Sequence, residues 1–261
     1  MYAIGERING MFRSVGAAIR EKNPQAIQEL AKRQLAAGAD ALDVNVGPAA
    51  VDPLEAMEWL VKTIREVTDA PLAIDTTKPD VMRRGLEVAG PGSIINSTKG
   101  QQEQLDIFIP MAAELQASVI ALTIDESGIP RDANGRSEIA LRAVASAMEH
   151  GLEPDRLMVD AVILPANVAQ PTAVQVLEAI RTVKLLSDPP PKTILGLSNV
   201  SQGTTQRPLI NRTYLVMALA CGLDAAILDV LDTEMMDAMI TAELLLNRAV
   251  YCDDFLRAYR S

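Results

Sequence analysis

Short apolar runs alternate along the chain with longer stretches in which apolar residues recur at helical spacing. Several runs are rich in Ile and Val and most are apolar throughout, which is typical of parallel strands that are buried on both faces. The predicted strands are Tyr2–Ile4, Ala41–Val46, Leu72–Ile74, Ser93–Ile95, Ser118–Thr123, Leu157–Val159, Thr193–Leu197 and Ala225–Leu228.

One predicted helix follows each strand. Asn23 and Asp52 each precede a proline at the first helical position, as N-caps do, and Gly38 is placed to end the first helix. The predicted helices are Pro24–Ala37, Pro53–Val67, Pro79–Val88, Gln102–Gln116, Ser137–Met148, Thr172–Leu186, Pro208–Ala220 and Glu234–Val250.

This alternation predicts the fold class. Eight strand–helix units in 261 residues indicate a closed (β/α)₈ TIM barrel, and an open doubly wound sheet is the competing architecture. No low-complexity linker divides the chain, so residues 1–261 are expected to form one domain. Hydrophobic residues make up 49% and aromatic residues only 3%, which predicts a core of Ala, Val, Ile, Leu and Met.

Charge and composition exclude several classes of function. A net charge of −10 argues against binding nucleic acid, which needs a concentrated positive surface. Two distant cysteines and one histidine, His150, leave no zinc site of ordinary composition, so no metal is expected. The start of the chain has no secretory pattern, and acidic residues interrupt the most apolar run, Tyr214–Leu231. We therefore expect a soluble, cytoplasmic protein with no membrane contact.

Polar residues gather where the predicted strands end, which is where TIM barrels carry their chemistry. They are Glu6, Asn9, Asp43, Asn45, Asp75, Asn96, Asp160, Ser198, Asn199 and Asp229. The only histidine lies at the end of a helix, which argues against a Ser-His-Asp triad. No predicted strand ends in lysine, although Lys78 and Lys99 lie a few residues beyond, which argues against Schiff-base chemistry.

A ring of Asp and Asn has a plain chemical meaning. A carboxylate accepts two parallel hydrogen bonds from an amidine-like edge, and an Asn side chain both donates and accepts. The 2-amino group and N3–H of a pterin form such an edge, so Asp75, Asn96 and Asp160 are suited to hold a pterin across the barrel mouth. The alternative is that these side chains cap the helices that follow them.

Seven segments resemble the methyltetrahydrofolate:corrinoid protein methyltransferases, the family of the acetogen enzyme that serves the corrinoid iron–sulfur protein. The resemblance runs over nearly the whole chain, and the last two segments are specific motifs rather than generic barrel features. The segments are Gly5–Gly10 (GERING), Asp43–Pro48 (DVNVGP), Asp75–Thr77 (DTT), Ile95–Thr98 (INST), Leu164–Gln170 (LPANVAQ), Gly196–Gln202 (GLSNVSQ) and Arg207–Arg212 (RPLINR).

The resemblance implies a homodimeric barrel that binds tetrahydrofolate or 5-methyltetrahydrofolate at its mouth and acts with a separate corrinoid protein carrying cobalamin. Asp75, Asn96 and Asp160 match the pterin-binding positions, and Asn199, Gln202 and Arg207 match further folate positions. The implied reaction moves the N5-methyl group to cobalt by in-line attack of cob(I)alamin, or runs in reverse.

We expect the catalytic residues to be Asn199, Asp75 and Asp160. A methylated N5 leaves only if it gains a proton or a strong hydrogen bond. Asn199 is therefore expected to donate to N5, while Asp75 and Asp160 anchor the ring and organise the water that delivers the proton. Arg207 is expected to pair with the benzoyl-glutamate tail or a ring acceptor, with a structural ion pair as its alternative.

Some residues depart from the family pattern, and some alternatives stay open. Thr76-Thr77-Lys78 follows Asp75 where relatives have Ser-Thr-Asn, and Ala161-Val162 follows Asp160 where they have Pro-Leu. These differences leave the corrinoid partner unassigned. The physiological direction is also open, because a demethylase system would pass methyl from the corrinoid protein to tetrahydrofolate. More remote alternatives are a dihydropteroate synthase-like enzyme and a non-catalytic folate carrier.

Overall fold

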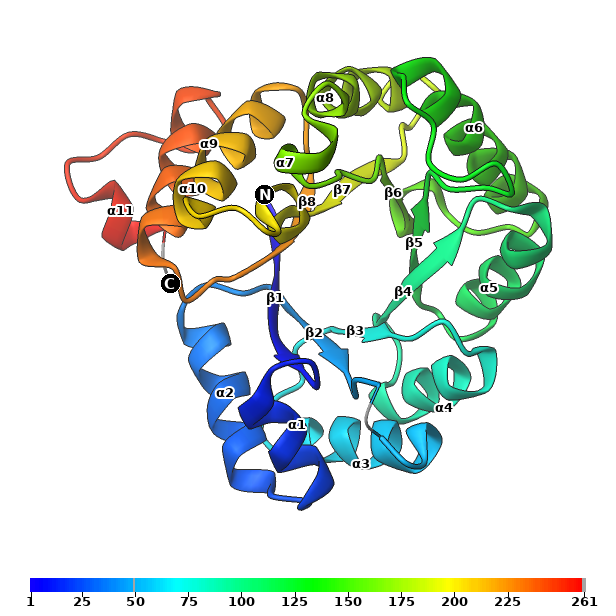
Figure 1. Cartoon of the computed structure of the whole chain (residues 1–261), viewed down its shortest axis with the longest axis vertical. Helices are drawn as coiled ribbons and strands as arrows, with labels where there is room; N and C mark the ends of the chain where they lie inside the picture. Colours follow the sequence, from blue (N-terminus) through cyan, green and yellow to red (C-terminus); the bar gives the residue numbers. More distant parts are fainter. Residues whose placement is uncertain (49, 260–261) are drawn as a thin grey trace.

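The closed barrel is confirmed. The computed structural model describes residues 1–48 and 50–259, and in these residues eight parallel strands pair in chain order, with β1 next to both β2 and β8 (Figure 1). Closure rules out the open sheet, which would leave two edge strands. The strands are β1 Tyr2–Asn9, β2 Ala41–Asn45, β3 Leu72–Asp75, β4 Ile94–Lys99, β5 Ser118–Leu122, β6 Leu157–Asp160, β7 Lys192–Gly196 and β8 Ala225–Leu228.

The predicted helices surround the barrel, each within a few residues of its expected bounds. They are α2 Pro24–Ala36, α3 Pro53–Arg65, α4 Pro79–Ala89, α5 Gln102–Glu114, α6 Ala133–Glu149, α8 Thr172–Val183, α9 Arg207–Ala220 and α10 Thr233–Leu245. The predicted caps are also confirmed, because Asn23 accepts the N–H of Ala26 and Asp52 accepts that of Leu54. The described residues contain no helix that is both long and apolar enough to cross a bilayer.

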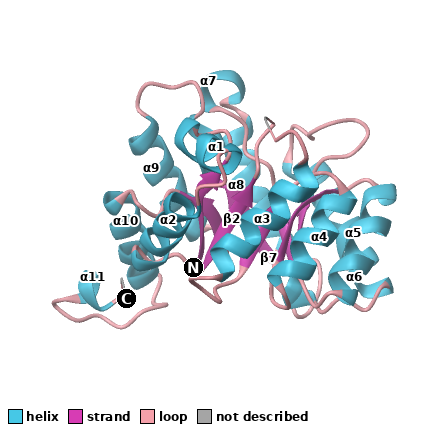
Figure 2. Ribbon diagram, turned by 90° about the horizontal axis from the view of Figure 1, so that it is seen from below, coloured by secondary structure: helices cyan, strands magenta, loops and turns pink. Residues whose placement is uncertain are grey.

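Three short helices have no counterpart in the sequence prediction: α1 Arg13–Arg20, α7 Ala166–Ala169 and α11 Phe255–Ala258. None of them has a side-chain N-cap, and helices this short have little stability of their own, so the local pattern carries no signal. Figure 2 shows α1 and α7 above the carboxyl ends of the strands, on the face opposite the chain termini. These two helices therefore border the barrel mouth.

Two strands run further than their apolar segments suggest. β1 continues to Asn9 and β4 to Lys99, and the pairing register shifts within each, between Gly5 and Ile8 and between Asn96 and Thr98. Such irregularities re-aim side chains where a strand reaches a site. The expectation that no strand ends in lysine was wrong, because Lys99 is the last residue of β4, but its side chain is exposed and does not line the cavity described below.

One residue from every strand forms a buried apolar layer inside the barrel, and small and large side chains both contribute to it. The layer consists of Ile4, Ala41, Ala73, Ile94, Ile120, Met158, Ile194 and Ala225. Because side chains alternate along a strand, the next inward position on each strand lies two residues further on, toward the mouth. This layer is the floor on which the site is built.

Candidate active site

The cavity at the barrel mouth has a volume of about 650 Å³, and the first ring of its wall comes from all the barrel strands. Each member of this ring lies two residues beyond a member of the apolar floor. The ring consists of Glu6, Asp43, Asp75, Asn96, Leu122, Asp160, Gly196 and Ile227, all of which line the cavity. Six of the eight residues are polar or glycine, so the cavity is a hydrogen-bonding site with an apolar base.

All six residues that the sequence singled out lie in the wall of this one cavity. They are Asp75, Asn96, Asp160, Asn199, Gln202 and Arg207. Asp75 and Asp160 are the last residues of β3 and β6, and Asn96 lies within β4. The other three belong to the segment after β7 and the start of α9. The fold thus brings together residues that lie up to 132 positions apart in the sequence, from Asp75 to Arg207.

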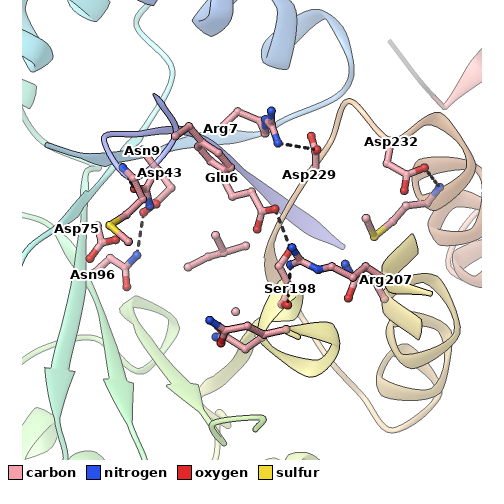
Figure 3. Close-up of a pocket in the computed structure, with 18 of the residues that line it drawn as sticks. Glu6, Arg7, Asn9, Asp43, Asp75, Asn96, Ser198, Arg207, Asp229 and Asp232 are labelled. Carbon is pink, nitrogen blue, oxygen red and sulfur yellow. Dashed lines mark hydrogen bonds and ion pairs between the residues drawn. The ribbon is translucent and has the colours of Figure 1, made fainter. Parts of the chain in front are cut away.

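Asp75 and Asn96 are each held by a side chain of β2. Asn45 Nδ2 donates to Asp75 Oδ2 at 2.6 Å, and Asn96 Nδ2 donates to Asp43 Oδ1 at 2.8 Å (Figure 3 shows the second bond). Asp75 and Asn96 are also register partners on adjacent strands. The outcome is a fixed pair in which one carboxylate oxygen and one amide oxygen stay available to a ligand.

Asp160 is fixed by backbone donors. Its Oδ1 accepts the N–H of Val162 at 2.7 Å, and its Oδ2 accepts the N–H of Gly196 at 3.3 Å. The residue is 7% exposed, and burial raises the pKa of its carboxyl group to about 6 although both N–H bonds act in the opposite direction. The carboxylate form therefore predominates at pH 7, and acid below about pH 6 converts it to the neutral form.

The helix-capping alternative is wrong for Asp75, Asn96 and Asp160. The helices after β3, β4 and β6 begin behind Lys78, Gln101 and Pro165, and none of these has a side-chain cap bond. The strand-end polar groups therefore form hydrogen bonds with each other or with their own loops, or they face the cavity. That is the arrangement expected of a binding site rather than of a helix terminus.

The 3₁₀ turn η2, Leu197–Ser201, forms the opposite wall and carries Asn199. Arg207 braces this turn, because its Nε donates to Ser201 Oγ at 3.1 Å and its Nη2 to the carbonyl oxygen of Ser198 at 3.3 Å. The structural ion pair considered for Arg207 is absent from the described residues. Its guanidinium instead fixes the backbone that presents Asn199.

Sequence reasoning placed Asp43 and Glu6 among the polar residues at the strand ends but assigned neither of them a binding or catalytic role. Asp43 is only 3% exposed, and burial followed by the nearby Asp75 charge raises the pKa of its carboxyl well above the ordinary range. Glu6 accepts the Ser198 hydroxyl at 2.8 Å, and burial raises the pKa of its carboxyl. A signal was available for Asp43, because a carboxylate inside the apolar run Ala41–Val46 must face the interior, but Glu6 lies beyond the apolar run Tyr2–Ile4.

Acidic groups dominate the mouth, yet no group of three or more His, Cys, Asp or Glu among the described residues is arranged to hold a metal ion. The two arginines of the wall are engaged elsewhere. Arg207 bonds to η2, while Arg7 bonds to Asp229 at 3.4 Å and its guanidinium carbon lies 4.3 Å above the ring centre of Phe12. The cavity therefore suits a ligand that is rich in N–H donors.

Comparisons with known proteins agree with this chemistry. A family model for pterin binding enzymes matches residues 5–229. The chain is 28% identical over its full length to the methylcorrinoid:tetrahydrofolate methyltransferase of Eubacterium limosum, of which it covers 96%. It is 30% identical over 86% of its length to a methionine synthase of Mycobacterium tuberculosis, of which the match spans 20%. The structure of a dihydropteroate synthase of Yersinia pestis with a pterine–sulfa conjugate superposes with a TM-score of 0.69 over 94% of each chain; at 16% identity this shows the fold alone.

Replacing Asp43 with asparagine is expected to stabilise the protein more at high pH than at low pH. The folded-state pKa of Asp43 lies above its ordinary value of 3.8, so the wild-type protein loses stability as pH rises through that folded-state pKa. An asparagine still accepts from Asn96 but cannot ionise. Urea unfolding at pH 5 and pH 8 should show the gain growing by on the order of 1 kcal/mol, the scale of one pKa unit.

The control for this experiment is Asp155→Asn, in an exposed turn, which should leave the difference between the two pH values unchanged. A gain for Asp43→Asn that is the same at both pH values would contradict a buried carboxyl that resists ionisation.

Proposed function

The chain belongs to the family of pterin binding enzymes, and from this premise we propose that it is a methyltransferase that moves the N5-methyl group between a tetrahydrofolate and the cobalt of a corrinoid held by a second protein. One observation carries the proposal: the acceptors Asp75, Asn96 and Asp160 line one cavity together with the amide of Asn199. The full-length likeness to a methylcorrinoid:tetrahydrofolate methyltransferase supports the same reaction class.

The fixed acceptors match the donors of a pterin ring. The 2-amino group and N3–H form a two-donor edge, which a carboxylate binds in parallel. Asp160 provides this carboxylate at neutral pH, and its two backbone N–H bonds hold it in place before the ligand arrives. Asp75 and Asn96 supply acceptors on the adjoining wall, each held by its β2 partner. A preorganised site of this kind loses little entropy when it binds.

Asn199 is the donor that we assign to N5. Its side chain lines the same cavity as the acceptors and lies beside Gly196, and Arg207 holds the turn through Ser198 and Ser201. A hydrogen bond from this amide stabilises the electron pair that N5 regains when the N–C bond breaks. In the opposite direction the amide releases the N5 lone pair as that pair attacks the incoming methyl group.

The corrinoid, when its own carrier protein presents it, supplies the cobalt that accepts or gives the methyl group. This chain supplies the position of N5 and a route to it. The helices α1 and α7 flank the mouth (Figure 2). Met11, just before α1, lines the cavity and is 70% exposed, and Val168, in α7, is 79% exposed. These residues are our candidates for contact with the carrier protein.

The alternatives make different predictions. A dihydropteroate synthase-like activity has support only from a likeness that shows the fold. A folate carrier without activity would bind folate and transfer no methyl group. The expected homodimer, the cytoplasmic location and the direction of transfer stay predictions.

The test mixes the purified protein with 5-methyltetrahydrofolate and free cob(I)alamin and follows the visible spectrum, with methylcobalamin and tetrahydrofolate as the reverse reaction. Protein-dependent transfer in at least one direction is expected. Folate binding without transfer, even when candidate corrinoid proteins are supplied, would favour the carrier. No binding of folate would end the pterin assignment.

Asn199→Ala is expected to lower the transfer rate by about 10²-fold or more, the usual scale for one positioned donor. The affinity for 5-methyltetrahydrofolate should change much less, because the other pterin contacts remain. Single-turnover kinetics with saturating folate measure the rate directly. A rate within twofold of the wild-type protein would remove Asn199 from the mechanism.

Asp160→Asn is expected to weaken tetrahydrofolate binding, since an amide accepts only one of the two parallel bonds. The wild-type affinity should also fall as pH decreases through about 6, where the Asp160 carboxylate gains a proton, and the variant should lack that dependence. Titration calorimetry from pH 5 to pH 8 measures both effects.

Asp232→Asn is the matched control, because Asp232 also lines the cavity but its Oδ1 caps α10 through the N–H of Met235, and an asparagine can keep that cap. Equal affinities for the wild-type protein and Asp160→Asn across the pH range would refute the amidine contact.

A further inference from the structure

Glu6 is a largely buried carboxyl group of the cavity wall to which the roles above assign nothing. We propose that Glu6 is the acid–base residue of the reaction, which gives a proton to N5 when the methyl group leaves folate and takes the proton back in the reverse direction. This role rests on the proposed function and names the source of the N5 proton.

The position of Glu6 follows from the strand geometry. It lies two residues beyond Ile4 of the apolar floor, so it points inward at the level of Asp75, Asn96 and Asp160. Figure 3 shows its carboxyl group directed toward the turn that carries Ser198, across the cavity from Asn96. It therefore belongs to the ring that surrounds the ligand, and not to the outer rim.

Glu6 is tied to the turn that presents Asn199. Its Oε1 accepts the Ser198 hydroxyl at 2.8 Å, and Ser198 is the immediate neighbour of Asn199 in η2. In the part of the chain that the structure describes, Oε2 has no hydrogen-bond partner. It is also not one of the side-chain polar atoms that are both fully buried and without a partner. One carboxyl oxygen is thus anchored beside the N5 donor, while the other is open to a molecule in the cavity.

Four charged groups face Glu6, and none of them forms an ion pair with it. Asp229 after β8 and Asp43 of β2 oppose its ionisation, whereas Arg7 and Arg207 favour it. Both arginines are engaged elsewhere, Arg7 with Asp229 and Arg207 with η2. Burial is the largest influence on Glu6 and raises its pKa, so the group holds a proton at a higher pH than an exposed glutamate does.

The other carboxyl groups of the cavity are committed to other contacts. Asp160 must be ionised to bind the amidine edge and is held by two backbone N–H groups. Asp75 is bonded to Asn45, Asp43 lies behind Asn96, and Asp229 is paired with Arg7. The sixth carboxyl group, Asp232, caps α10. Among these six, within the described residues, only Glu6 accepts a hydrogen bond from the turn that carries Asn199, and its second oxygen is free.

The proton balance of the step is simple. In methyl donation the O–H bond of Glu6 breaks as an N5–H bond forms, and N5 becomes positive. When the methyl group leaves, the electron pair of the N5–C bond stays on N5 and neutralises it, and the pair for the new bond comes from the reduced corrinoid substrate. The Glu6 carboxylate then regains a proton from water. In methyl acceptance N5 supplies the pair, and its proton passes to the Glu6 carboxylate.

The decisive variant is Glu6→Gln, which keeps an oxygen to accept the Ser198 hydroxyl but cannot deliver a proton. Single-turnover transfer from 5-methyltetrahydrofolate to free cob(I)alamin should slow by about 10²-fold or more, within the range for one general acid. Tetrahydrofolate affinity should stay within about threefold of the wild-type value, which also shows that the variant is folded.

The pH dependence separates a proton donor from a positioning residue. In the wild-type protein, methyl donation should slow as pH rises and Glu6 loses its proton, whereas methyl acceptance should slow as pH falls. In Glu6→Gln the rates of methyl donation and methyl acceptance should lose this opposite dependence on pH. Glu6→Asp should keep the dependence at lower rates. Ser198→Ala removes the hydrogen bond but leaves the carboxyl group. This variant should therefore keep the pH dependence of both transfer rates and lose less than about tenfold in rate.

Two outcomes would overturn the role of Glu6 while leaving the proposed function in place. In the first, Glu6→Gln transfers within threefold of the wild-type rate. In the second, Glu6→Gln transfers more slowly but keeps the wild-type pH dependence of both rates, which would mean that Glu6 only positions η2. A wild-type protein that transfers no methyl group in either direction, with free corrinoid or with a corrinoid protein, would overturn the proposed function and the Glu6 role together.

Discussion

The alternation of side chains along eight closed strands is the constraint on which the site depends. Closure forces one inward position of each strand into a common apolar layer, and the next inward position into the ring that lines the mouth. The polar ring needs no loop to assemble it. Its members are placed by the same geometry that fills the barrel, so the rigidity of the core is passed directly to the groups that line the mouth.

The sequence was enough to predict the barrel, the approximate bounds of its strands and the six residues that meet at its mouth. It failed where polar residues continue a strand, as in β1 and β4, because an apolar run marks only the buried part of a strand. It also could not give the bonds Asn96–Asp43 and Asn45–Asp75, which join residues 53 and 30 positions apart. Such pairings depend on the register of neighbouring strands, and no local pattern encodes that register.

The wall of the cavity works against the stability of the protein. Four of its carboxyl groups, Glu6, Asp43, Asp75 and Asp160, have pKa values raised chiefly by burial, and none of them is neutralised by an ion pair within the described chain. The hydrophobic floor and the surrounding helices must offset that cost. Sites arranged in this way bind ligands that bring the missing donors, which is the electrostatic character expected of a pterin pocket.

The cavity residues on the strands and the rim residues on the loops form two parts of the molecule. These two parts can change independently over evolution. An insertion within a strand would turn every later side chain to the opposite face and abolish the site at once, so the ring can diverge only by substitution. The segments that carry α1 and α7 are not strands, so an insertion there does not reverse the facing of the residues that follow. Lineages could therefore exchange one docking partner for another by remodelling those segments while the inherited chemistry stays intact.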